Sequence, residues 1–206
     1  MNDRTRTITI GGQVRPALLT VRAAKVLTES YGGLTETVEA LTGDAPFEKK
    51  KPILANVLSL LMSEGAKSEN YFNGNDYYKQ IANQFTEDSI SSENLGFLIF
   101  QTALVIRAGA ERYVLTKKEK QIAEFEKLKA ELGADGEETA GEDPEGPRAG
   151  YSQWIFIGVT LLRRPEREVW LMPLGALADQ YALFKIYNGQ DIAKEETIDD
   201  VLDGVE

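Results

Sequence analysis

The residues best suited to chemistry are four charged side chains that flank Pro165. Arg163 and Arg164 precede this proline, and Glu166 and Glu168 follow it. Carboxylates beside cations could act as general acid and base on a substrate. Acidic side chains just after a proline are equally typical of a helix start, where the helix dipole favours them. Because the chain has no histidine, the commonest acid–base side chain is missing, and we favour the helix start.

Two further clusters could bind a phosphate or a metal ion. Gly11 and Gly12 form a glycine pair, but neither the Gly-Lys-Ser/Thr ending of a phosphate loop nor a helix follows. Oxygen-bearing side chains are dense over residues 73–78, as in a calcium loop. The glutamate that closes such a loop would fall near Asn83 or Gln84, and neither is acidic. We therefore predict no catalytic residue, no cofactor and no metal site, and a protein that is not an enzyme.

Composition narrows the class of function. Of the 206 residues, 42% are hydrophobic, which is enough for one ordinary core or two small ones. With 33 acidic and 23 basic side chains, the formal net charge is −10, which disfavours binding to nucleic acid or anionic lipid. Cysteine is absent, as fits a reducing cytosol, and no apolar run approaches the about 20 residues of a membrane span. We expect a soluble intracellular protein with neither a nucleic-acid nor a membrane partner.

The elements that would position these residues begin with a β-hairpin. Residues 6–10 alternate polar and apolar side chains, and Gly11-Gly12 form a two-residue turn. Residues 13–15 return as a second strand, which should be short or at an edge because Pro16 cannot donate to the ladder.

Helices should follow the hairpin and form a small bundle. The glycines that would end helices are Gly32, Gly43 and Gly65, and the expected helices begin near Thr20, Thr35, Pro52, Asp76 and Ser91. The helix from Ser91 is apolar nearly all round, which predicts a place in the centre of the bundle. Residues 117–132 are charged but keep apolar side chains at helical spacing, which predicts a solvated helix.

An acidic segment should divide the chain into domains. The hairpin and helices occupy residues 1–132, and residues 133–150 are rich in acidic residues and glycine, which predicts a disordered linker. Residues 151–190 form an aromatic module of helices, and residues 191–206 an acidic tail. The predicted fold is therefore mainly α: a small helical bundle with an N-terminal β-hairpin, an acidic disordered linker and a small helical C-terminal module.

The aromatic module contains both tryptophans of the chain, Trp154 and Trp170. Tryptophan is most often a core residue, but it is also enriched where proteins dock, and both interpretations stay open. A module of about 40 residues rarely folds well without a partner. We predict that the module binds protein through Trp154, Trp170, Leu171, Met172 and Leu174.

With the linker and the module in view, the chain resembles the tail assembly chaperones of bacteriophages and prophages. In the C-terminal part, the resemblance rests on Leu161–Glu166, the string EVWLMPLG at 168–175, Asp179-Gln180 and the terminal residues 197–201. In the N-terminal part, it rests on Arg15-Pro16, Thr20–Lys25, Tyr31–Leu34 and Glu64-Gly65. The two parts together cover about two thirds of the chain and leave the linker unmatched.

The resemblance implies an assembly factor with two partners. The N-terminal domain would bind the tail tape measure protein and keep it soluble, and the C-terminal module would recruit the tail tube (major tail) protein. The chaperone would act in the host cell cytoplasm and be absent from the mature virion. Two alternatives stay open: a structural tail or head component retained in the virion, and a hydrolase or transferase that acts through carboxylates such as Glu166 and Glu168.

Overall fold

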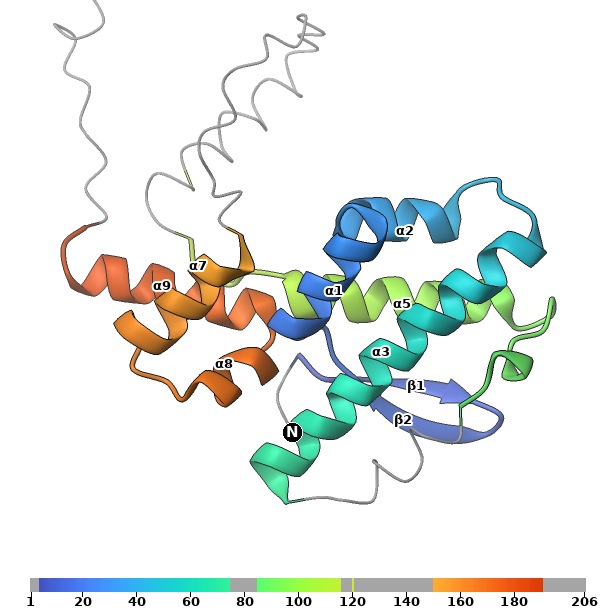
Figure 1. Cartoon of the computed structure of the whole chain (residues 1–206), viewed down its shortest axis with the longest axis horizontal. Coiled ribbons are helices and arrows are strands. Elements are labelled where there is room, and N and C mark those ends of the chain that lie inside the picture. The colour runs from blue at the N-terminus through green and yellow to red at the C-terminus, as the bar shows by residue number, and fades with distance from the viewer. Residues whose placement is uncertain (1–3, 75–84, 116–119, 121–149, 191–206) are drawn as a thin grey trace, which may run out of the picture. The chain divides into compact units, whose positions relative to one another are not determined.

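The computed structural model describes residues 4–74, 85–115, 120 and 150–190. Within these ranges the chain is mainly helical, and a two-stranded antiparallel hairpin lies near its N-terminus (Figure 1). This architecture confirms the predicted fold class. The helix expected from Asp76, most of the helix expected over 117–132, residues 133–149 of the linker and the tail after 190 lie outside the described residues.

The hairpin pairs β1 (Arg6–Ile10) with β2 (Gln13–Ala17), with Ile8 opposite Arg15. Gly11 and Gly12 form the turn with φ of 58° and 76°. Two consecutive residues with positive φ suit the right-handed twist of the strands, and glycine adopts them without a steric penalty. The prediction of this hairpin is confirmed.

The first two helices have the predicted signals at their ends. In α1 (Val21–Tyr31), the Thr20 side chain accepts a hydrogen bond from the Ala23 N–H at 3.1 Å, which is an N-cap. Gly32, with φ of 95°, ends this helix. The next helix, α2 (Leu34–Thr42), ends at Gly43, as expected.

The third helix, α3 (Phe47–Asn73), is much longer than predicted. It begins at Phe47, five residues before Pro52, so the predicted start at Pro52 was wrong. Pro52 therefore lies inside the helix, beyond the first turn, and its missing N–H removes one i→i−4 hydrogen bond. The helix also continues through Gly65, so the predicted stop there was wrong. A Cβ on this glycine would lie 2.6 Å from the Pro16 carbonyl oxygen, so the glycine lets α3 approach β2 closely.

The fourth described α-helix, α5 (Leu95–Ala110), follows the short 3₁₀ turn η1 (Glu87–Ser89). Its inner face is buried, and its buried residues are Leu98, Thr102, Val105, Ile106, Ala108 and Gly109. Its outer face is exposed, so the prediction that this apolar helix is enclosed by the bundle was wrong. Among the described elements, β1, α2 and α3 have the most extensive contacts with α5.

The main core lies between the hairpin and these helices. Ile8 and Ile10 from the hairpin meet apolar residues of the helices in one cluster. Large members of that cluster on the helices that are fully or almost fully buried include Leu27, Leu41, Leu54, Leu58, Leu61, Met62, Leu98 and Val105. The Leu18 N–H donates to the Leu61 carbonyl at 3.1 Å, which ties the chain after β2 to α3.

The aromatic module is helical, as predicted, but it packs on the N-terminal helices. Its elements are α7 (Tyr151–Phe156), the π-helical turn η2 (Ile157–Leu161), α8 (Glu166–Leu171) and α9 (Leu174–Tyr187). A second apolar cluster joins Val21 of α1 to Val169, Met172 and Leu177. The Val21 N–H donates to the Met172 carbonyl at 2.9 Å, and Thr20 and Pro173 form an isolated β-bridge.

The chain forms two compact units. One compact unit joins Met1–Arg112 to Ala149–Ala178, and the other joins Tyr113–Arg148 to Asp179–Glu206. The boundary near the C-terminus falls inside α9 and not before the aromatic module. Apolar side chains of residues 154–177 pack with Val21 of α1 in the second cluster.

In the second unit, the carboxylate of Asp179 fastens the start of that unit to α9. It accepts hydrogen bonds from the backbone N–H groups of Tyr113 and Val114, each with a shortest distance of 3.0 Å. Charge-assisted bonds to backbone N–H groups are among the stronger hydrogen bonds of a protein.

Candidate protein-interaction surface

The residues predicted to bind protein lie in or beside the second apolar cluster. Leu171 and Met172 are only 3% and 6% exposed, so they are core residues and are not available to a partner in this arrangement. Trp154, Trp170 and Leu174 are half-buried and pack against the same cluster. The structure brings Trp154, Trp170, Met172 and Leu174 together in the cluster that contains Val21 of α1. Leu171 is buried as well, but it is not a member of that cluster.

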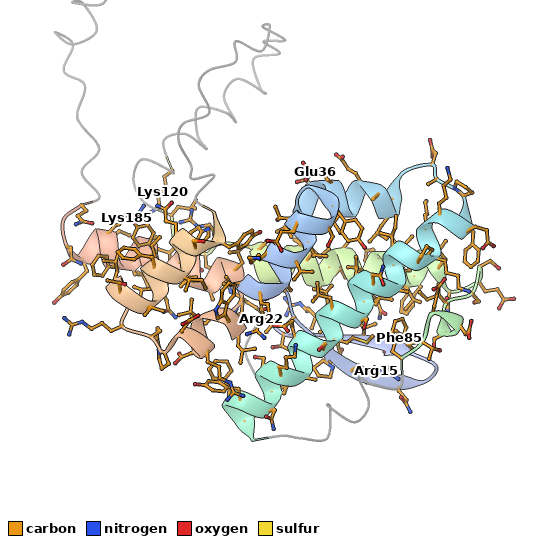
Figure 2. All side chains as sticks on the ribbon, viewed as in Figure 1. Arg15, Arg22, Glu36, Phe85, Lys120 and Lys185 are labelled. Carbon is orange, nitrogen blue, oxygen red and sulfur yellow. The ribbon has the colours of Figure 1, made fainter. Side chains whose placement is uncertain are left out.

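Trp170 illustrates this structural role. Its indole N–H donates to the Glu166 carboxylate at 3.1 Å within α8. The guanidinium carbon of Arg22, which is labelled in Figure 2, lies 5.9 Å from the centre of the Trp170 ring. A cation at this distance from an aromatic ring is attracted to its face. The ring of Trp170 therefore joins α8 to α1, while its N–H group is bonded within α8.

The carboxylates beside Pro165 also have partners. Glu166 accepts the hydrogen bond from Trp170, and Glu168 pairs with Arg164 at 2.9 Å. Pro165 directly precedes α8, so the prediction of a helix start there is confirmed. Among the described residues, no group of three or more acidic side chains is placed to hold a metal ion.

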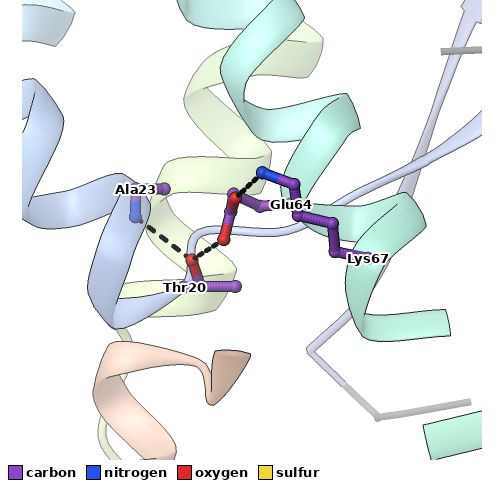
Figure 3. A network of polar contacts seen from close by, with 4 residues as sticks. All are labelled: Thr20, Ala23, Glu64 and Lys67. Atoms are coloured by element: carbon purple, nitrogen blue, oxygen red, sulfur yellow. Dashed lines mark hydrogen bonds and ion pairs between the residues drawn. The ribbon is translucent and has the colours of Figure 1, made fainter. Parts of the chain in front are cut away.

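A buried polar network lies where α1, α3 and the C-terminal segment meet (Figure 3). The Thr20 hydroxyl donates to one carboxylate oxygen of Glu64 at 2.9 Å, and Lys67 pairs with the other oxygen at 2.7 Å. Glu64 is fully buried, whereas Lys67 reaches solvent. Each oxygen of Glu64 is thus occupied from within the fold, which indicates a structural role. In the sequence, this glutamate entered only as part of the resemblance and was given no structural role.

Arg15 is also buried, but unlike Glu64 it has polar atoms without a hydrogen-bond partner. It is buried beside Ile8 on the core side of the hairpin, and its Nη2 donates to the Gln13 side chain at 2.8 Å. Its Nε and Nη1 have no hydrogen-bond partner in the described structure. Burial away from water lowers the pKa of this guanidinium. Unpaired buried donors cost stability, so these two nitrogens offset what the bond to Gln13 contributes to the hairpin.

The clearest candidate surface is the outer face of α5. Phe97, Phe100 and Leu104 are 56%, 60% and 42% exposed and lie at positions i, i+3 and i+7, so they form one row along the helix. We call these three residues the α5 stripe. At the side of β1, the Thr9 N–H donates to the Gln101 side chain at 3.4 Å, which marks one edge of the stripe.

The sequence correctly indicated that α5 is apolar nearly all round. The prediction drawn from this, that α5 lies in the centre of the bundle, was wrong. A helix that is apolar all round is usually enclosed by its own protein. Periodicity cannot show how many neighbouring elements are available to cover it. The same sequence pattern is produced by a helix whose outer face is covered by another molecule, and the stripe fits that second case.

A smaller apolar surface lies on the C-terminal segment. Phe156 at the end of α7 and Val159 in η2 are both exposed and are three positions apart. Gly158 between them faces inward, where an added Cβ would lie 2.6 Å from the methyl groups of Val169. This glycine lets η2 pack tightly on α8 and leaves Phe156 and Val159 on the outside.

Comparison of the chain with protein-family models, with curated proteins and with solved structures gives no match. In the described part of the chain, no helix has both the length and the apolar character needed to cross a membrane.

Proposed function

We propose that this chain is a tail assembly chaperone of the bacteriophage type, and that the α5 stripe is the surface that holds its helical client. The single observation that carries the proposal is the row of exposed Phe97, Phe100 and Leu104. Large apolar side chains gathered on one exposed face are a common mark of a protein interaction site. The resemblance in sequence to tail assembly chaperones supplies the identity of the client, the tail tape measure protein.

The stripe suits a helical client for a geometric reason. Side chains at i, i+3 and i+7 form a ridge, and such a ridge packs into the groove between side chains of a second helix. A tape measure protein is long and helical, and its apolar faces have no partner before the tail tube forms. Covering those faces with the stripe would remove apolar surface of both molecules from water, which is the main driving force for association.

We propose that the second partner, the tail tube protein, contacts Phe156 and Val159. These residues belong to the C-terminal part that the resemblance associates with the tube. They are exposed, whereas Leu171 and Met172 are occupied in the core. The tryptophans and their neighbours would then support this surface from beneath, by holding the C-terminal segment on α1.

The net charge of −10 fits a factor that keeps an aggregation-prone client dispersed, because like charges keep complexes apart. We propose that the protein acts in the host cytoplasm and is released before the virion is complete. Mass spectrometry of purified virions separates this role from that of a structural component. A chaperone is absent from the particles, whereas a tail or head component is present in a fixed ratio.

Co-expression with the tape measure protein of the same phage tests the proposal. We expect the wild-type chain to co-purify with the tape measure protein and to keep it in the soluble fraction. Phe100→Glu should reduce the recovered complex at least about tenfold, because a charge is placed in an interface that must lose water. Phe72→Glu is the matched control, since Phe72 is also an exposed phenylalanine on a helix, at 46%. The proposal is wrong if neither co-purification nor added solubility is seen with the wild-type chain.

A further inference from the structure

We infer that the α5 stripe is also a self-association surface, and that two copies of the chain pair antiparallel through α5 when no client is present. The observation behind this inference is that the stripe is complementary to itself. An isologous contact brings the same patch of both copies together around a two-fold axis, so each feature must meet its complement on the same helix. Two features of α5 satisfy that condition, one of size and one of charge.

The first feature is the alternation of large and small side chains. We place the two-fold axis near Phe100. Leu104 of one copy then faces the part of the partner helix that contains Gly96. Phe97 faces the part that contains Ala103. Gly96 is exposed, and a Cβ added to it would have no other atom within 4 Å, so there is open space at this point. A large side chain of one helix can therefore fill the gap beside a small residue of the other, as knobs fill holes in paired helices.

The second feature is charge at the two ends of the stripe. Glu93 lies just before α5 and Arg107 lies in its last turn, and both are exposed. They are seven residues before and seven residues after Phe100. Antiparallel pairing around Phe100 therefore places Glu93 of each copy beside Arg107 of the other and forms two ion pairs. The helix dipoles are also antiparallel in this arrangement, which is their favourable orientation.

The size of the contact predicts a weak dimer. A helix of 16 residues, the length of α5, is about 24 Å long. A single pair of helices of this length buries less than the about 1,600 Å² of a standard stable interface. The two copies also each carry a net charge of −10, although salt at physiological concentration screens this repulsion beyond about 8 Å. Weak pairing would let a client displace the second copy.

Sedimentation velocity of the full chain from about 1 µM to about 1 mM covers the range in which a weak dimer forms. We expect a monomer at the low end and a dimer at the high end. Phe100→Glu should raise the dissociation constant at least tenfold, because it brings two like charges together at the two-fold axis. Phe72→Glu should leave association unchanged. Far-UV circular dichroism of both variants checks that they remain folded.

A charge exchange tests the antiparallel arrangement itself. Glu93→Arg and Arg107→Glu should each weaken the dimer, because each places like charges beside one another. The double variant should restore association to near the wild-type level, since the two ion pairs are re-formed with reversed signs. No other pairing of α5 with a second copy predicts this rescue together with the loss in Phe100→Glu.

The inference is overturned if the wild-type chain stays monomeric throughout, if Phe100→Glu associates like the wild type, or if the double variant does not recover. The dimer rests on the self-complementarity of α5 alone, and only its exchange for a client rests on the proposed function. Adding the tape measure protein separates the two. If the dimer forms and the tape measure protein never displaces the second copy, the inference stands and the proposed client site is rejected. If the tape measure protein binds the stripe of a chain that is always monomeric, the client site stands and the inference is rejected.

Discussion

At the scale of single residues, Thr20 has three structural tasks. Its hydroxyl caps α1, donates to the buried carboxylate of Glu64, and lies at the β-bridge to Pro173. A buried carboxylate is stable only when it is paired and hydrogen-bonded. Thr20 and Lys67 together supply that environment. The cap of α1 and the hydrogen bond to Glu64 of α3 therefore both depend on the hydroxyl oxygen of Thr20.

Replacing Thr20 with valine should therefore lower the free energy of unfolding by about 2–4 kcal/mol. About 1 kcal/mol comes from the lost cap, and about 1–3 kcal/mol from the buried acceptor left with one partner fewer. Thr20→Ser keeps the hydroxyl and should cost only about 1 kcal/mol, through the lost methyl group. Urea denaturation of both variants measures the difference. A valine variant within about 0.5 kcal/mol of the wild type would show that the network is not needed.

At the scale of elements, glycines decide how closely helices approach their neighbours. Gly65 lies inside α3, where sequence rules predicted an end, and Gly109 lies inside α5. An added Cβ would lie 2.6 Å from a backbone oxygen at Gly65 and 2.5 Å from the Leu19 side chain at Gly109. These glycines are therefore contact points and not helix breakers.

Gly65→Ala tests this interpretation against the ordinary effect of glycine in a helix. Alanine has a higher helix propensity by up to about 1 kcal/mol, and this gain applies to any helical glycine. At Gly65 the clash with β2 should outweigh the gain, with a net loss of about 1–3 kcal/mol in the free energy of unfolding. Gly96→Ala is the control, because its added Cβ meets only open space. Thermal denaturation of dilute protein compares the two. Equal stabilisation by both alanines would refute the role given to Gly65.

Sequence reasoning succeeded where local chemistry decides the structure. The turn at Gly11-Gly12, the cap at Thr20 and the helix start after Pro165 all depend on neighbours in the chain, and all were predicted. It failed where distant segments meet. Nothing in the periodicity of residues 151–178 indicates that their apolar side chains pack on Val21, and nothing in α5 indicates which of its faces is left uncovered.

At the scale of the whole molecule, two kinds of apolar surface must be distinguished. The aromatic residues that first suggested docking complete the core of one compact unit. The α5 stripe and the pair Phe156 and Val159 are exposed apolar surfaces on that same unit. The account places the client on the stripe and the tube protein on the pair, so each partner would have a contact surface of its own.

Hydroxyl-radical footprinting of the complex with the tape measure protein tests this account most directly. The account predicts that Phe97, Phe100 and Leu104 lose most of their reactivity when the client is bound, measured at dilutions where the chain alone is monomeric. Phe72 should react equally with and without client, since it lies outside the stripe. A complex in which the stripe stays as reactive as in the free chain, while other residues become protected, would contradict the central claim.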